Sequence, residues 1–245
     1  MQLLTKITIK SLLSTLLIFV SGHAMASDND TGIYHGLEGG LTIYEAVNIF
    51  GHKLVHNHPA NPNDHAGEEK KVTINHGIGW NGLYKIGYRY NGWRLETQLG
   101  YAESDVEKHR QTIGEAVLNI PERGKTTTYS AMLAAKYYLT LSPITTKAGI
   151  YVGAGAGVAH IQGKGIDKKK VDVTEVIIRD HSDTAFAWQL ETGVFYNISP
   201  RVDISLGYRF FKTPNVDVID SSYHYTEKPT YKTHNVNLGF TYKFR

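Results

Sequence analysis

The chain has 245 residues, of which 41% are hydrophobic and 20% charged, and its formal net charge is +3. These values exclude a bundle of transmembrane helices, which needs several apolar runs of about 20 residues, and a disordered chain, which contains few aromatic residues. The absence of cysteine excludes disulfides, cysteine zinc sites and thiol nucleophiles, and the balanced charge argues against a nucleic-acid partner. A soluble β-protein and a membrane β-barrel both remain.

The first 26 residues are predicted to be a cleaved secretory signal peptide, which leaves residues 27–245 as a single domain. Two lysines precede an apolar run at 12–20, and Ala24-Met25-Ala26 has the small-x-small pattern of a signal-peptidase site. The apolar run is shorter than the roughly 17 residues that a membrane-spanning helix requires. The sequence therefore predicts export from the cytoplasm.

Beyond residue 30, apolar and polar residues alternate with the period of two that is typical of strands. The pattern is clear from Trp93 to Tyr101, where Leu95 and Leu99 lie on one face and Arg94 on the other. The even number of such segments is compatible with a closed barrel. The eight predicted strands lie within 33–50, 78–90, 93–101, 126–139, 147–161, 186–196, 201–210 and 235–244.

The connections between these segments alternate between short and long. Asn91-Gly92 joins the second and third segments and is the signature of a type I′ hairpin turn. Short turns at one end and long hydrophilic loops at the other are typical of outer-membrane barrels. The long connections are polar or charged and lie at about 51–77, 104–125, 162–183 and 212–231.

Alternation alone does not say which face of the barrel points inward. A soluble barrel of the lipocalin type has an apolar interior, whereas a membrane barrel has an apolar exterior. Aromatic residues near both ends of the apolar faces, such as Trp93 with Tyr101 and Phe186 with Tyr196, suit the two interfacial girdles of a membrane protein. We therefore predict an all-β fold, an eight-stranded antiparallel up-and-down transmembrane β-barrel with short periplasmic turns and long extracellular loops.

Charged residues on the polar faces are expected inside this barrel. An eight-stranded barrel has an interior about wide enough to be filled by side chains, and a buried charge needs a partner. Gly149, Gly153, Gly155 and Gly157 would make room for bulky neighbours. We predict a structural network of ion pairs in the lumen, formed by Lys85, Arg89, Glu96, Glu191, Asp203 and Arg209.

Several short motifs resemble the small eight-stranded outer-membrane barrels of Gram-negative bacteria, of the OmpA/OmpX type and the opacity or porin-family barrel domain. They are Gly87-Tyr88-Arg89-Tyr90, Leu99-Gly100-Tyr101, the glycine-rich segment 149–157, Leu206-Gly207-Tyr208-Arg209-Phe210 and the segment 237–244. The resemblance implies location in the cell outer membrane, with membrane lipid and lipopolysaccharide as partners. It also implies a C-terminal signal for the barrel-assembly machinery, although Arg245 follows the usual final aromatic residue; the signal residues are Gly239, Phe240, Tyr242 and Phe244.

The first long connection contains histidines that are candidate metal ligands. Imidazole and carboxylate groups bind zinc, copper or nickel, and acidic residues lie close by in the sequence. The spacing matches no defined metal motif, so a polar loop in which histidine is frequent is the competing interpretation. The candidate ligands are His52, His56, His58 and His65.

A structural or surface-interaction role, in adhesion, host contact or envelope integrity, is expected to be carried by the loops. The expected partners include a host surface or extracellular ligand, with a monomeric protein and no cofactor. A narrow channel for ions or small solutes is one alternative, and a lipid A-modifying enzyme is another. His181-Ser182-Asp183 is the nearest triad-like segment, but neighbouring strand residues point to opposite faces. We therefore expect no enzymatic activity.

Overall fold

The chain forms strands throughout the parts that the structure describes. A computed structural model gives twelve strands in one sheet, and among the described residues no helix is long and apolar enough to cross a membrane. The predicted signal peptide lies outside the described residues. Those residues are 31–53, 69–113, 116–120, 124–141, 147–165, 181–216, 223–225 and 228–244.

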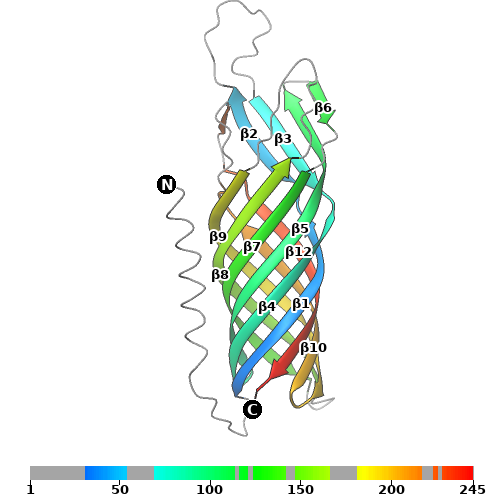
Figure 1. The fold of residues 1–245 in the computed structure, drawn as a ribbon, viewed down its shortest axis with the longest axis vertical. Helices are drawn as coiled ribbons and strands as arrows, with labels where there is room; N and C mark the ends of the chain where they lie inside the picture. Colours follow the sequence, from blue (N-terminus) through cyan, green and yellow to red (C-terminus); the bar gives the residue numbers. More distant parts are fainter. Residues whose placement is uncertain are drawn as a thin grey trace, which may run out of the picture.

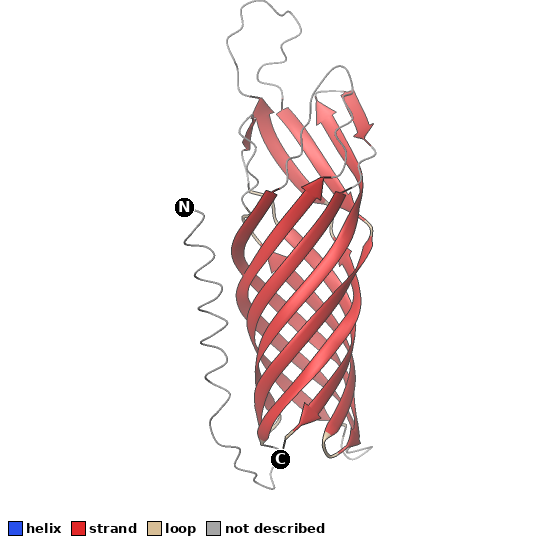
Figure 2. Ribbon diagram, viewed as in Figure 1, coloured by secondary structure: helices blue, strands red, loops and turns tan. Residues whose placement is uncertain are grey.

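Eight of the strands close into a barrel (Figure 1, Figure 2). Around the barrel each strand is antiparallel to the next, and the last returns to the first. This confirms the predicted fold class. The barrel strands in spatial order are β1 (Gly32–Tyr44), β4 (Ile78–Tyr90), β5 (Trp93–Ile113), β7 (Gly124–Thr140), β8 (Ala148–Gly165), β9 (His181–Ser199), β10 (Val202–Thr213) and β12 (Tyr231–Lys243).

Apolar side chains cover the outside of the barrel and polar side chains fill the inside. Leu95 and Leu238 are 64% and 70% exposed on the outer face, whereas Lys136 and Glu96 are buried inside. In water this exposed apolar surface would be unfavourable by about 25 cal/mol per Å², while a bilayer accepts it and requires a closed barrel to pair every backbone group. The orientation therefore favours the membrane barrel over the lipocalin-like alternative.

Aromatic residues gather near both ends of the apolar face. At the end with the short turns, the ring centroids of Trp93 and Tyr137 are 5.0 Å apart. Toward the other end, Tyr101 lies 5.0 Å from Trp80 and 5.3 Å from Tyr129, measured between ring centroids. Such rings suit the two lipid–water interfaces, because each has an apolar body and a polar tip.

The turn between β4 and β5 has the predicted conformation. Asn91 and Gly92 have φ angles of 47° and 80°, which is the left-handed geometry of a type I′ turn. The Gly92 carbonyl also accepts a hydrogen bond of 2.8 Å from the Tyr138 amide of the neighbouring strand. This contact fixes the short-turn end of β4 and β5 against β7.

The predicted boundaries of the long loops are wrong, because strands continue into them. The segment 51–77 contains part of β2 (Val47–Lys53) and all of β3 (Glu69–His76), and 104–125 contains the end of β5 and β6 (Ala116–Ile120). The other two long connections are shortened by β8, β9 and β12 and include β11 (Tyr223–Tyr225). Outside the membrane a strand needs no apolar face, so its backbone pairs without leaving an alternating pattern in the sequence.

These added strands build a sheet above the barrel. β3 pairs with the upper part of β5, β2 pairs with β3, and β11 pairs with β2, while β6 folds back onto β5. Figure 1 shows β2, β3 and β6 at the end of the molecule opposite the C-terminus. The long-loop end therefore carries a β extension of the barrel wall, formed by β2, β3, β6, β11 and the upper part of β5.

Candidate functional site

The centre of the lumen is occupied by one lysine shared between two glutamates. The Lys136 ammonium lies 2.6 Å from a carboxylate oxygen of Glu96 and also pairs with Glu191. The Gln98 amide donates to the same two carboxylates, over 2.6 and 2.9 Å, and the Tyr34 hydroxyl donates to Glu96 over 2.6 Å. The two carboxylates are thus held by a cation and by hydrogen bonds, as buried charges require.

A second pair joins the strands next to this cluster. Lys85 of β4 donates to the Glu38 carboxylate of β1, and both side chains are almost fully buried. The lysine crosses β1 at Gly36, where a Cβ atom would lie 2.8 Å from the Lys85 Cε. The missing side chain at Gly36 therefore provides the space for the lysine stem.

A third cluster closes the lumen near the short turns. Asp203 at the start of β10 pairs with Arg94 over 3.0 Å and also with Lys243. The Lys243 ammonium donates to the Asn197 side-chain oxygen over 2.8 Å. The Arg94 guanidinium lies over the Tyr138 ring, 3.6 Å from its centroid, a favourable cation–π arrangement. The periplasmic end of the barrel is thus also blocked by paired charges.

Each ion pair described above joins a residue of the predicted network to one outside it. Glu96, Glu191, Lys85 and Asp203 of that network are buried, and their partners are Glu38, Arg94, Lys136 and Lys243. Arg209 lies 3.4 Å from the Asn81 side-chain oxygen, and Arg89 lies beside Gly32.

Three of the four residues that the prediction omitted stand on polar faces of the alternating segments. Arg94, Lys136 and Lys243 alternate with outward-facing apolar residues in the sequence, but alternation does not say which strands face one another across the lumen. Glu38 stands between Gly36 and Gly40 on the inward face of β1. A charged residue flanked by glycines on an inward face was the available signal for it.

The glycine-rich strand β8 makes the expected room inside the barrel. A Cβ atom at Gly153 would lie 2.5 Å from the Lys136 Cγ, and one at Gly155 would lie 3.1 Å from the Gln189 side-chain nitrogen. The side chains of Lys136 and Glu96 are 0% exposed, so solvent does not reach the central cluster. The lumen at this level is filled by side chains rather than by a water channel.

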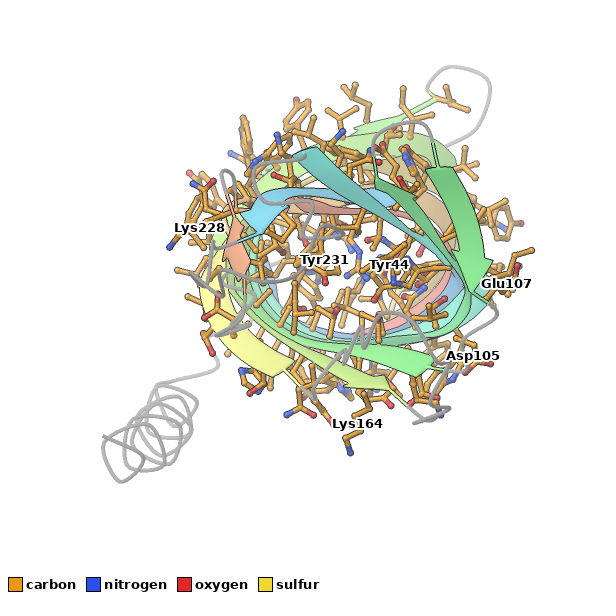
Figure 3. All side chains as sticks on the ribbon, turned by 90° about the horizontal axis from the view of Figure 1, so that it is seen from above. Tyr44, Asp105, Glu107, Lys164, Lys228 and Tyr231 are labelled. Atoms are coloured by element: carbon orange, nitrogen blue, oxygen red, sulfur yellow. The ribbon has the colours of Figure 1, made fainter. Side chains whose placement is uncertain are left out.

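Above the charged clusters, apolar side chains fill the mouth of the barrel. The Val216 amide donates to the Pro229 carbonyl over 3.0 Å, which holds the chain after β10 inside the mouth. Figure 3 places Tyr44 and Tyr231 inside the ring of strands. The buried members of this mouth cluster are Tyr44, Val47, Ile74, Ile161, Val216 and Tyr231.

The candidate metal ligands fall mostly outside the part of the chain that the structure describes. His56, His58 and His65 lie in the segment 54–68, and for His52 only the backbone is described, in β2 opposite His224. Within the described ranges no group of three histidine or acidic side chains could hold a metal ion. Metal binding by the loop histidines stays a prediction.

The predicted assembly signal occupies the last barrel strand and the residue after it. Phe240 and Phe244 are 49% and 42% exposed on the lipid-facing side, and the Tyr242 ring centroid lies 5.3 Å from that of Phe244. Gly239 faces inward, where a Cβ atom would lie 2.4 Å from the Ser205 hydroxyl. Recognition by the assembly machinery stays a prediction.

Comparison with known families decides the class of the protein. Residues 12–244 match the family of the outer membrane protein beta-barrel domain. The chain belongs to this family. It is therefore an outer-membrane β-barrel protein, located in the cell outer membrane as the resemblance implied.

Solved structures with similar barrels come from several bacteria. Neisserial surface protein A is 19% identical, with 87% of this chain and 97% of that chain covered and a TM-score of 0.46. OprG from Pseudomonas aeruginosa is 13% identical, with 89% and 98% covered and a TM-score of 0.45. The attachment invasion locus protein of Yersinia pestis, solved with the heparin analogue sucrose octasulfate, is 12% identical, with 86% and 99% covered and a TM-score of 0.37. No curated protein matches the sequence.

Proposed function

We propose that this protein is a closed membrane scaffold that displays an extracellular surface, with a role in adhesion, host contact or envelope integrity. The observation that carries the proposal is the filled lumen. The side chains of Lys136 and Glu96 are 0% exposed, and that of Glu191 is 3% exposed. Ions that pass through a channel need hydrated or polar surfaces to replace their own water shell. A conducting lumen would therefore leave these charged groups exposed to water.

The β extension supplies the surface that the scaffold would display. It is continuous with the barrel wall through β5, which runs without a break from the periplasmic turn at Trp93 to Ile113. Binding residues on loops are positioned well when a rigid scaffold carries them. This arrangement supports a role in recognition outside the membrane.

Removal of the β2–β3 hairpin tests the surface role. Ile43 and Ile78 are paired in the β1–β4 ladder, so replacing Val47–His76 with Asn-Gly should leave the barrel closed. Cells that carry this variant should lose binding to host-cell and extracellular-matrix surfaces, while the heat-modifiable gel migration of the barrel is retained. Equal binding by the variant and the wild type would contradict the proposal, as would a wild type that binds no better than cells without the protein.

The alternative of a narrow channel makes an opposite prediction. The filled lumen predicts that the folded protein gives no stable unitary openings in planar bilayers. A Lys136→Gln variant should be equally silent. Stable wild-type openings whose ion selectivity changes in that variant would support a channel and contradict the closed scaffold.

We also propose that the barrel has no lipid A-modifying activity. His181, Ser182 and Asp183 occupy successive positions of β9, and successive positions of a strand belong to opposite faces of the sheet. A serine nucleophile needs its base within hydrogen-bond reach. Mass spectrometry of lipid A should therefore give the same acyl pattern with and without the protein, and a missing acyl chain would contradict this.

A further inference from the structure

A group of polar and basic side chains lies on the outside of the barrel, at the upper edge of the apolar face. We call it the rim cluster, and it consists of Glu45, Tyr208, Lys212, Lys232 and His234. Lys212 and Lys232 are paired across β10 and β12. Glu45, which directly follows β1, accepts from Lys232 over 2.9 Å and lies 3.0 Å from the His234 Nε2. The Tyr208 hydroxyl lies 2.6 Å from the His234 Nδ1.

The position of the rim cluster matches the depth of lipid head groups. Going up β12, the outward residues Phe240, Leu238 and Val236 are 49%, 70% and 50% exposed and apolar. The next two outward residues are His234 and Lys232, which have side chains 35% and 38% exposed. The change from hydrocarbon-compatible to charged side chains therefore occurs within one step of the strand, at the side of the long loops.

The rim cluster has more cationic than anionic groups. Glu45 is shared by Lys232 and His234. Lys212 has no acidic partner among the described residues, and its ammonium lies 5.9 Å from the centroid of the Trp188 ring. Two lysines against one glutamate leave the cluster positive even when the histidine is neutral, and this excess is available to an anion.

On the opposite side of the barrel, the upper rim has more acidic than basic side chains among those named below. On β5 and β7, Lys125 pairs with Glu103 over 2.8 Å, and Asp105 and Glu107 are exposed nearby. Figure 3 shows Asp105 and Glu107 on one side of the barrel and Lys228, just before β12, on the other. An anionic ligand in the membrane would therefore approach the β10–β12 side.

Aromatic rings next to the lysines form an apolar shelf. The Trp188 and Phe210 ring centroids are 5.5 Å apart, and the Phe210 and His234 centroids are 5.4 Å apart. Aromatic rings at this depth contact acyl chains on one side and the polar interface of the membrane on the other. A ligand with a phosphate above several acyl chains would meet the lysines and the shelf together.

We infer that the rim cluster is a binding site for the phosphorylated glycolipid of the outer leaflet, lipid A. One phosphate group lies between Lys212 and Lys232, and the acyl chains lie against Trp188 and Phe210. Tyr208 and Glu45 hold the imidazole of the cluster in place. The site faces the membrane, so it does not depend on the proposed surface interaction.

Native mass spectrometry of the folded protein released from micelles tests this site. The probes are bisphosphorylated lipid A, the same lipid without its phosphates, and phosphatidylglycerol. The wild type should retain lipid A in preference to the other two. The variant Lys212→Gln/Lys232→Gln should bind it about 30-fold more weakly, since each lysine at an anionic lipid surface contributes about 1 kcal/mol.

Two control variants make the result specific. Lys212→Arg/Lys232→Arg keeps both charges and should retain lipid A like the wild type. Lys125→Gln removes a lysine of similar exposure from the opposite side of the same rim and should not change the retention of lipid A. All variants should keep the heat-modifiable migration of a folded barrel. Equal retention of lipid A by the glutamine variant, equal retention of the phosphate-free lipid or of phosphatidylglycerol, or an equal loss in Lys125→Gln would each overturn the inference.

Discussion

Replacement of Lys136 by methionine should strongly destabilise the barrel. The change removes the cation shared by Glu96 and Glu191 and leaves two buried carboxylates facing each other without it. At 2.6 Å and an effective dielectric constant of about 20, the attraction between Lys136 and Glu96 alone is about 6 kcal/mol. Loss of the lysine also removes its own desolvation penalty, so the expected net loss of unfolding free energy is about 3–5 kcal/mol.

The same reasoning predicts that the loss can be reversed without restoring the lysine. The triple variant Lys136→Met/Glu96→Gln/Glu191→Gln leaves none of these three charges in the central cluster and should recover most of the lost stability. Lys125→Met is the matched control, because its ion pair with Glu103 is 40% and 21% exposed and should contribute no more than about 1 kcal/mol.

Urea unfolding in lipid vesicles, followed by the fluorescence of the three tryptophans, measures these differences from the shift of the midpoint. A loss below about 1 kcal/mol in Lys136→Met would mean that the two glutamates are not desolvated. A triple variant as unstable as the single variant would mean that packing of the lysine stem, rather than its charge, stabilises the lumen. Either result would refute the account of the central cluster.

Three further predictions use the same unfolding assay. Gly207→Ala places a Cβ atom 2.1 Å from a buried tyrosine hydroxyl and should cost about 1–3 kcal/mol, whereas Gly82→Ala, with nothing within 4 Å, should be close to neutral. Leu238→Arg puts a charge in the middle of the lipid face and should cost about 2–4 kcal/mol, while Ile78→Arg at the upper rim should cost about 0–1 kcal/mol; equal costs would contradict the assigned depth. The Glu45 carboxylate accepts hydrogen bonds from Lys232 and His234, and these bonds lower the pKa of the carboxyl group. The hydrogen bonds therefore stabilise the folded barrel at a pH above the ordinary carboxyl pKa. This stabilisation is lost as the pH falls through the lowered pKa. Acidification should therefore shift the midpoint less in Glu45→Gln than in the wild type.

The sequence by itself determined the strands that cross the membrane. A membrane strand has one face in hydrocarbon and one in the lumen, so every second residue must be apolar, and β4 coincides with the predicted segment 78–90. The Asn91-Gly92 turn was predictable for a similar reason, because the φ angles of 47° and 80° suit few other residue pairs. Above the membrane this constraint disappears, and β3 and β6 were predicted as loops.

Only the tertiary structure decided which charges meet, and it confirmed the outward apolar face that the aromatic girdles predicted. Alternation is the same for an apolar exterior and an apolar interior, whereas the closed barrel places Leu238 outside and Lys136 inside. The partners of a lumen charge come from strands across the barrel, as with Lys136 and Glu96, and the register and closure of the sheet set these distances. The alternating pattern of a strand reflects the environment of each of its faces. Closure of the barrel determines which side chains contact one another inside the lumen.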